Sequence, residues 1–154
     1  MVLHARGQWL ATAESCTGGL VAKLMTDIAG SSGWFERGLV TYSNAAKRDL
    51  LGVPAATLET AGAVSAETVV AMADGLLARA PVQWTLAISG IAGPGGGGDG
   101  KPVGTTWIAW AGSGIAASAS RFRFDGGRDE VRRLAAEAAL NGLIELLAAS
   151  DSKS

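Results

Sequence analysis

The sequence has few of the side chains on which several large enzyme classes depend. Its 154 residues include one cysteine, Cys16, and one histidine, His4. A single cysteine cannot form an internal disulfide or a cysteine-rich zinc site, and its scarcity fits a reducing cytoplasm. His4 lies at the N-terminus, which we expect to be loosely held, so Ser-His-Asp and Cys-His catalysis are excluded. A hydrolase of this composition needs lysine, a carboxylate or tyrosine as its base.

The sequence also lacks an excess of charge and long apolar runs. Its formal net charge is -1, which gives no support for binding to nucleic acid or to a membrane surface. No run approaches the roughly 18 apolar residues of a membrane-spanning helix, and no segment resembles an export signal. We therefore expect a cytoplasmic protein that binds neither nucleic acid nor membranes.

What is present predicts one α/β domain over residues 1–154. The composition is 48% hydrophobic and 18% charged, as in globular proteins. Expected strands alternate with expected helices, and Gly112-Ser113-Gly114 indicates a closing hairpin, so we predict a three-layer α/β/α sandwich with a mixed sheet. We expect strands at 8–13, 37–43, 84–89, 103–111 and 115–124, helices at 17–28 and 44–51, one after Ser65 and one after Gly127, a loop with at most a short helical turn at 53–63, and a polar tail at 151–154.

Ser15 stands at a predicted strand-to-helix junction, within Ala13-Glu14-Ser15-Cys16-Thr17-Gly18-Gly19. A serine here can be a nucleophile, with the Cys16 and Thr17 amides forming an oxyanion hole, or merely a helix cap. The Cys16 thiol is a rival nucleophile or a packed core group. Glu14 can orient a cation or complement the helix dipole.

A second polar cluster, Tyr42-Ser43-Asn44-Ala45-Ala46-Lys47, follows the second expected strand. A lysine held near Ser15 in a dry site would have a lowered pKa and accept the serine proton, whereas an ordinary Lys47 would be solvated. Ser89 ends the third expected strand, so Ser15, Tyr42 and Ser89 should meet at one edge of the sheet. Arg128 begins the last helix, where it can bind a phosphate or simply face solvent.

The glycine-rich segment 90–102 matches dinucleotide and phosphate-loop spacings in part. Both motifs need a helix directly after the loop, but Val103 onward is typical of a strand. The segment is therefore either a flexible connection or a loop whose backbone passes close to a ligand.

These motifs together resemble the CinA C-terminal domain family. The resemblance rests on the Ser15 segment, on Val40-Thr41-Tyr42-Ser43-Asn44 with Lys47, on Ile88-Ser89-Gly90-Ile91-Ala92-Gly93-Pro94, and on Lys101-Pro102-Val103-Gly104-Thr105. It covers almost the whole chain. Members of this family include bacterial nicotinamide mononucleotide deamidases.

The resemblance implies a reaction and a set of site residues. The reaction is hydrolysis of the carboxamide of nicotinamide mononucleotide, without metal or organic cofactor. Ser15 would be the nucleophile and Lys47 its base, with an oxyanion hole at Cys16 and Thr17. The remaining matches are Tyr42, which we group with the catalytic residues, and Ser32, Ser89, Gly90 and Arg128, which we expect to bind substrate.

Two departures and one alternative accompany the resemblance. Members usually carry a longer helix before the first strand than residues 1–6 allow, which would expose core surface or alter assembly. The larger CinA proteins also have an N-terminal domain whose activities do not transfer. We expect a homo-oligomer, with a dimer favoured. The alternative function is a catalytically silent nucleotide-binding or regulatory module, since CinA relatives are associated with competence and DNA damage.

Overall fold

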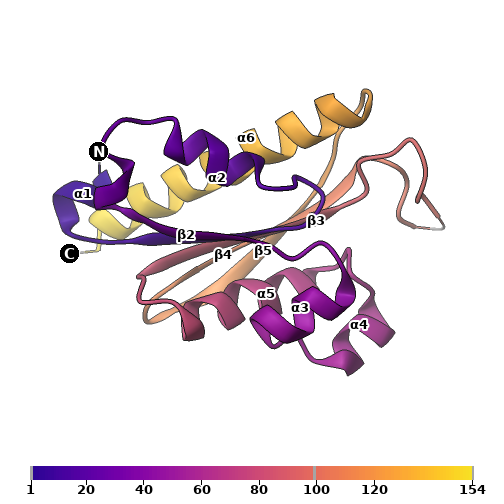
Figure 1. Ribbon diagram of the computed structural model, residues 1–154, viewed down its shortest axis with the longest axis horizontal. Coiled ribbons are helices and arrows are strands. Elements are labelled where there is room, and N and C mark those ends of the chain that lie inside the picture. The colour runs from indigo at the N-terminus through magenta and orange to yellow at the C-terminus, as the bar shows by residue number, and fades with distance from the viewer. Residues whose placement is uncertain (1, 99, 154) are drawn as a thin grey trace.

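The protein folds around one five-stranded sheet that lies between two layers of helices (Figure 1). The computed structural model describes residues 2–98 and 100–153. The strand order is β2-β1-β3-β4-β5. The predicted three-layer α/β/α sandwich is confirmed.

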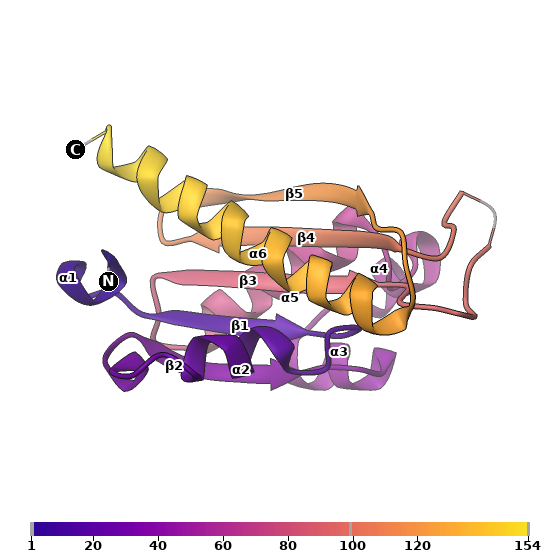
Figure 2. The ribbon, with the colours of Figure 1, turned by 90° about the horizontal axis from the view of Figure 1, so that it is seen from above.

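The sheet is mixed, as the hairpin signal predicted. β1 (Leu10–Glu14) pairs in parallel with both β2 (Phe35–Val40) and β3 (Trp84–Gly90). β4 (Thr105–Gly112) is antiparallel to β3 and to β5 (Ile115–Arg123). The carboxyl ends of β1, β2 and β3 therefore meet at one edge of the sheet (Figure 2).

Each face of the sheet has its own helices (Figure 1). One face carries α1 (Val2–Arg6), α2 (Leu20–Thr26) and the long α6 (Arg128–Asp151). The other carries α3 (Asn44–Leu51), α4 (Ala55–Ala61) and α5 (Ala66–Arg79). A short 3-10 helix, η1 (Ser31–Gly33), precedes β2.

The two faces of the strands differ in side-chain size. On the α5 side the buried apolar residues of the strands are alanines, namely Ala11, Ala13, Ala87, Ala109 and Ala111. On the α6 side they are large, namely Leu10, Trp84, Leu86, Ile88, Ile108 and Trp110. Because successive strand residues point to opposite faces, this alternation fixes which face each helix layer covers.

Three expectations for the ends and connections were wrong. The N-terminus is not loose: α1 buries Leu3 completely, and Arg6 donates to the Leu147 carbonyl at 2.9 Å, which ties α1 to α6. Residues 53–63 contain the two-turn helix α4, because Ala55-Ala56-Thr57-Leu58 buries Leu58 against α5. The tail is shorter than expected, since α6 continues to Asp151, and Ser154 lies outside the described residues.

Element boundaries moved most near the sheet edge where polar residues gather. α2 begins at Leu20 rather than Thr17, because Gly18 has a φ of +61° that no helix contains. β2 ends at Val40, which leaves residues 41–43 as a connection into α3. The early end of β2 leaves the carbonyls of Thr41 and Tyr42 at this edge available to a side-chain donor. No helix within the described residues is long and apolar enough to cross a membrane.

The contact between α6 and β4 requires a glycine. Trp110 donates its indole N–H to the Ala139 carbonyl at 2.9 Å, and its ring lies over Gly142. A Cβ on residue 142 would come within 2.1 Å of that ring.

We therefore expect Gly142→Ala to lower the free energy of unfolding by about 1–3 kcal/mol, although alanine normally stabilises a helix. Urea denaturation would measure the change. The control is the exposed neighbour, Asn141→Ala, which should change stability by less than about 0.5 kcal/mol. Equal stability of Gly142→Ala and wild type would contradict this packing.

Candidate active site

A pocket of about 310 Å³ lies at the carboxyl edge of β1, β2 and β3. It brings together residues that lie far apart in the sequence. The sequence-predicted residues that line it are Ser15, Cys16, Tyr42, Lys47, Ser89, Gly90 and Arg128. The predicted meeting of Ser15, Tyr42 and Ser89 is therefore seen in the structure.

Ser15 and Lys47 are in direct contact in this pocket. The Lys47 Nζ lies 3.1 Å from the Ser15 Oγ, 2.9 Å from the Thr41 carbonyl and 3.0 Å from the Tyr42 carbonyl. Lys47 is 1% exposed and Ser15 7% exposed. Of the two readings left open by the sequence, the solvated lysine is excluded.

Burial lowers the pKa of Lys47 from its usual 10.5, because an ammonium group is poorly solvated there. Within the described residues, its hydrogen bonds go to a hydroxyl and two carbonyls rather than to a carboxylate. A neutral amine has two N–H groups and one lone pair. It can donate to the carbonyls of Thr41 and Tyr42 and accept the hydroxyl proton of Ser15, which is the arrangement of a nucleophile and its base.

Glu14 holds the turn that carries Ser15. Its buried carboxylate accepts hydrogen bonds from the Thr17 hydroxyl at 2.7 Å and from the amides of Val21 and Ala22 at 2.8 and 3.1 Å. The carboxylate thus satisfies free N–H groups at the start of α2, where a negative charge is favourable. Of the two roles considered for Glu14, the structure supports the helix-start role.

The two residues expected to form the oxyanion hole differ in position. Cys16 lines the pocket, whereas Thr17 is completely buried and does not. Both belong to a turn before α2 rather than to a helix start. Within the described residues, neither main-chain amide donates to another residue's oxygen.

Burial also decides the state of the Cys16 thiol. It raises the thiol's pKa from 9.0 to about 11, with the nearby Glu14 charge acting in the same direction. A thiol with this pKa is almost entirely protonated at neutral pH and is a poor nucleophile. The structure therefore favours Ser15 over Cys16.

Tyr42 and Arg128 lie at the rim of the pocket. Tyr42 is 62% exposed, and its hydroxyl accepts from Arg128 at 3.4 Å. Arg128 also donates to the Gly93 carbonyl at 2.7 Å, which fixes the start of the glycine-rich loop. The contribution of Tyr42 to the Ser15–Lys47 pair is its main-chain carbonyl, a role that side-chain patterns do not reveal.

The glycine-rich loop forms one wall of the pocket. Gly93, Gly95 and Gly96 line it from one side and Ala63 and Val64 from the other. Lys101 donates to the Ala61 carbonyl at 2.9 Å and so connects the loop to the end of α4. Sequence reasoning missed Ala63 and Val64 because neither carries a pattern that separates it from an ordinary loop residue, and it placed Lys101 in a family motif without giving it a role. Of the two readings of the loop, the structure supports close approach to a site.

Of the two serines expected to bind substrate, Ser89 lies in the pocket and Ser32 does not. Ser89 is 1% exposed, and its hydroxyl lines the pocket without a hydrogen-bond partner within the described residues. Ser32 lies in η1, next to Trp34, whose carbonyl accepts from Leu10 at the amino end of β1. Residues before a parallel strand lie at the opposite edge from residues after it, so Ser32 is not part of this pocket.

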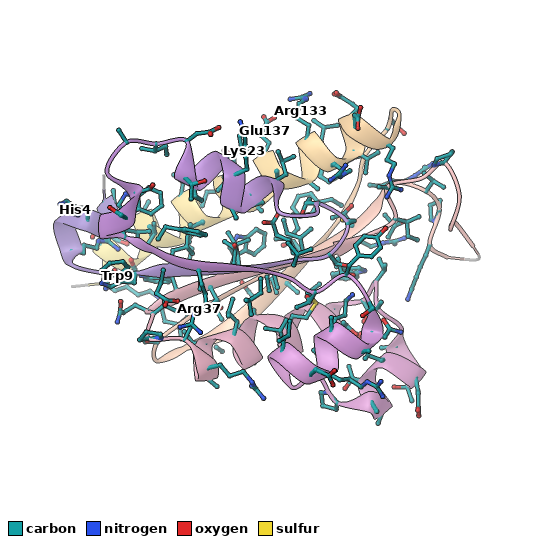
Figure 3. All side chains as sticks on the ribbon, in the orientation of Figure 1. His4, Trp9, Lys23, Arg37, Arg133 and Glu137 are labelled. Carbon is teal, nitrogen blue, oxygen red and sulfur yellow. The ribbon has the colours of Figure 1, made fainter. Side chains whose placement is uncertain are left out.

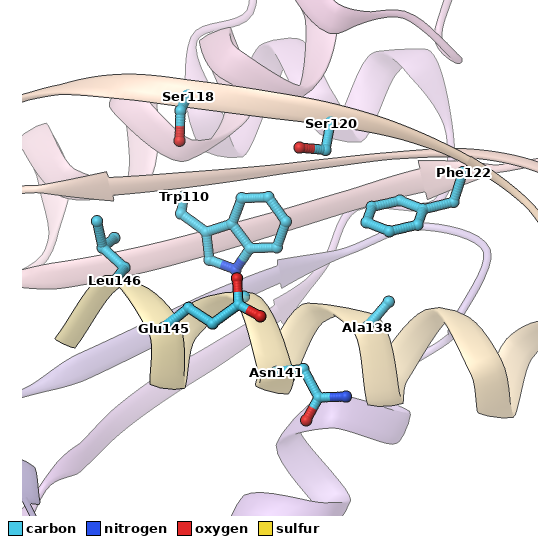
Figure 4. Close-up of a pocket in the computed structure, with 9 residues that line it drawn as sticks. Trp110, Ser118, Ser120, Phe122, Ala138, Asn141, Glu145 and Leu146 are labelled. Atoms are coloured by element: carbon cyan, nitrogen blue, oxygen red, sulfur yellow. The ribbon is translucent and has the colours of Figure 1, made fainter. Parts of the chain in front are cut away.

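The outer sides of two helices and a second hollow differ in character from this pocket. Lys23, Arg133 and Glu137 project from the outer sides of α2 and α6, away from the sheet (Figure 3). A larger hollow of about 530 Å³ lies between α6 and the β4–β5 hairpin, lined by serines, Asn141 and aromatic rings (Figure 4). No group of three His, Cys, Asp or Glu within residues 2–98 and 100–153 is placed to hold a metal ion.

Known proteins resemble this chain over most of its length. The model of the CinA C-terminal domain matches residues 1–147. The chain belongs to this family. Within the CinA C-terminal domain family, it is 55% identical over 141 residues to the nicotinamide-nucleotide amidohydrolase PncC of Escherichia coli, covering 92% of this chain and 86% of that protein.

Two further similar proteins are a longer relative and a solved structure. A CinA-like protein of Geotalea daltonii is 54% identical over 143 residues, but these make up only 34% of that longer protein and 92% of this chain. The crystal structure of the competence damage-inducible protein A of Klebsiella pneumoniae superposes with a TM-score of 0.91 at 44% identity, covering 95% of this chain and 90% of the other.

Proposed function

We propose that the protein hydrolyses the carboxamide of nicotinamide mononucleotide, giving nicotinic acid mononucleotide and ammonia. The observation that carries this proposal is the 3.1 Å contact between Lys47 Nζ and Ser15 Oγ in a pocket of a chain 55% identical to a nicotinamide-nucleotide amidohydrolase. The substrate is thus a small pyridine mononucleotide, and the reaction is the hydrolysis of a linear amide.

The proposed mechanism has two steps with Lys47 as the proton carrier. In the first, Ser15 Oγ attacks the carboxamide carbon and its proton moves to neutral Lys47. The protonated amine then gives this proton to the departing nitrogen, so that the C–N bond breaks and ammonia leaves an acyl-enzyme. In the second, water attacks the ester and passes a proton to Lys47, and Ser15 regains a proton as the acid departs.

The pocket suggests how the rest of the substrate binds. The Cys16 amide, which lines the pocket, is the proposed donor to the oxyanion, and the Thr17 amide is the weaker candidate because Thr17 does not reach the pocket. Arg128 and the Tyr42 hydroxyl at the rim offer a cation and a donor for the phosphate. Ser89 and Gly90 line the floor between these ends.

The alternative is a silent nucleotide-binding or regulatory module that uses the same pocket. It is supported by the match to a third of a longer CinA-like protein, in which such a domain is joined to other sequence. We place the protein in the cytoplasm as a proposal, which rests on its single, buried cysteine.

We expect Ser15→Ala to lower the rate of ammonia release from nicotinamide mononucleotide at least about a thousandfold, because the nucleophile is lost. Lys47→Met should lower it at least about a hundredfold, because the general base is lost. A coupled ammonia assay on purified protein measures both. Matched controls outside the pocket are Ser118→Ala on β5 and Lys23→Met on α2, which should retain the wild-type rate.

Each contrary outcome has a defined meaning. Wild-type protein that binds the nucleotide by calorimetry but releases no ammonia would favour the silent module. Activity that survives Ser15→Ala but not Cys16→Ala would make the thiol the nucleophile. An active Lys47→Met protein would remove lysine from the mechanism.

The pH dependence of kcat/KM should report Lys47. The reactive form is the neutral amine, so the rate rises with pH as Lys47 loses its proton. Because burial lowers the pKa of Lys47 from 10.5, the rising limb should have its midpoint below pH 10.5. Initial rates at saturating buffer capacity between pH 5 and about 10 would measure this limb. A limb at the ordinary lysine value would contradict a desolvated base.

We also propose that the chain forms a homodimer. Its support is an apolar groove of about 510 Å³ between α1, the end of α2 and α6, around which Val2, Ile28 and Ile144 are exposed. Exposed apolar patches of this kind are typical of protein interfaces.

Light scattering should give twice the mass of the chain, and Ile144→Glu should shift the measured mass toward that of the monomer. Asn141→Glu, which adds the same charge outside this groove, is the control, and a monomeric wild type would refute the dimer.

A further inference from the structure

Arg132 on α6 contacts the turn that follows Ser15. Its Nη2 donates to the Thr17 carbonyl at 3.2 Å, across a sequence separation of 115 residues. The approach is close enough that a Cβ on Gly18 would lie 2.8 Å from this nitrogen. Glycine is therefore required at position 18 for two reasons: the close approach of Arg132 leaves no room for a Cβ, and the backbone has a φ of +61°.

Thr17 is held from two sides by opposite charges. Its hydroxyl donates to the buried Glu14 carboxylate at 2.7 Å, and its carbonyl accepts from Arg132. The carbonyl also accepts from the Leu20 amide at 3.1 Å. A residue fixed at both its side chain and its carbonyl keeps its backbone, and the adjoining Cys16 peptide, in one orientation.

The environment of Arg132 does not suggest that this arginine is there to stabilise the fold. Its Nε is buried and has no hydrogen-bond partner within the described residues. Leaving a buried polar group unpaired is unfavourable, so an apolar side chain would suit the packing between α2 and α6 better. The charge of Arg132 also reaches the pocket, because it acts to lower the pKa of the Cys16 thiol against the dominant effect of burial.

Arg132 stands one helical turn after Arg128, on the same side of α6. Arg128 holds the glycine-rich loop through the Gly93 carbonyl, and Arg132 holds the Ser15 turn through the Thr17 carbonyl. The first two turns of α6 thus fasten two walls of the pocket.

We propose that Arg132 is a positioning residue for the hydrolytic site, whose guanidinium fixes the Cys16–Gly19 turn and adds positive charge beside the amide that binds the oxyanion. This inference rests on the proposed amidohydrolase function. Arg132 acts through Thr17 and does not touch the substrate. Loss of its contact affects the transition state, where negative charge develops, more than substrate binding.

The test compares Arg132→Met and Arg132→Lys with wild type in the ammonia assay. We expect Arg132→Met to lower kcat at least about tenfold with KM within about twofold, since a displaced oxyanion donor loses less than a deleted one. Arg132→Lys, which keeps the charge but not the planar donors, should recover part of this loss. The control is Arg133→Met, which removes an exposed cation paired with Glu130 and Glu137 on the same helix.

A second measurement follows the turn itself. In ¹⁵N-labelled protein, the Gly18 amide signal should shift and exchange faster with solvent in Arg132→Met but not in Arg133→Met, because the Thr17 carbonyl and the Gly18 amide share one peptide group. An unchanged kcat in Arg132→Met, or an unchanged Gly18 signal, would overturn the inference.

The outcomes separate this inference from the proposed function. Wild-type protein without ammonia release refutes the proposed function and the oxyanion part of this inference, and the Gly18 signal then decides whether Arg132 positions the turn. Active wild type with an equally active Arg132→Met refutes this inference alone. A thermal melt of each variant identifies loss of fold, in which case Arg132→Lys supplies the decisive comparison.

Discussion

The burial of the Lys47 amine beside a hydroxyl and two carbonyls is the interaction on which the rest of the site depends. Burial makes the charged ammonium form less favourable than it is on an exposed lysine, and this lowers the pKa of Lys47. The two carbonyls that receive its N–H groups, those of Thr41 and Tyr42, are free because β2 ends at Val40. The early end of β2 thus frees the two carbonyls that hold the Lys47 Nζ beside Ser15.

The sheet keeps this arrangement rigid. β1 is the strand between β2 and β3, so the turn after it is flanked on both sides by strand ends. Glu14, the last residue of β1, receives the first free amides of α2, and Lys47 begins the second turn of α3 on the opposite face. The turn that carries Ser15 leads into α2, whereas Lys47 lies on α3 on the opposite face, so these two residues meet at the sheet edge, where both are buried.

Much of the architecture could be predicted because it depends on local patterns. Apolar periodicity gave the five strands and the main helices, and the cap at Ser65 was correct because its hydroxyl accepts from the Thr68 amide at 3.2 Å. The helix α4 was missed because its seven residues form a stable helix only when Leu58 packs on α5. The resemblance implied a shortened helix before the first strand, but the firm attachment of α1 was not foreseen, because Leu3 and Arg6 depend on a distant part of α6.

The site was predictable in its side chains and not in its backbone. Four predicted residues have side chains whose reactive or charged groups are evident from the residue type, and strand ends at one edge of the sheet bring them together. They are Ser15, Lys47, Ser89 and Arg128. The carbonyls of Thr41 and Tyr42 have no such signature, because every residue has a carbonyl. Ser32 was expected in the site from resemblance alone, and its position before β2 places it at the other edge.

The glycine-rich wall of the pocket has a consequence for how such a site can change. The wall consists of Gly93, Gly95 and Gly96, which present main chain to the pocket, and the loop is held by Arg128 at one end and Lys101 at the other. Exchanging one amino acid for another leaves the peptide N–H and C=O groups of this wall in place. A point mutation can therefore narrow the pocket, but it hardly alters the main-chain groups that line it. Lengthening or shortening the segment between the two cationic anchors moves the whole wall. Divergence in substrate size within such a scaffold should therefore proceed through insertions and deletions more readily than through substitutions.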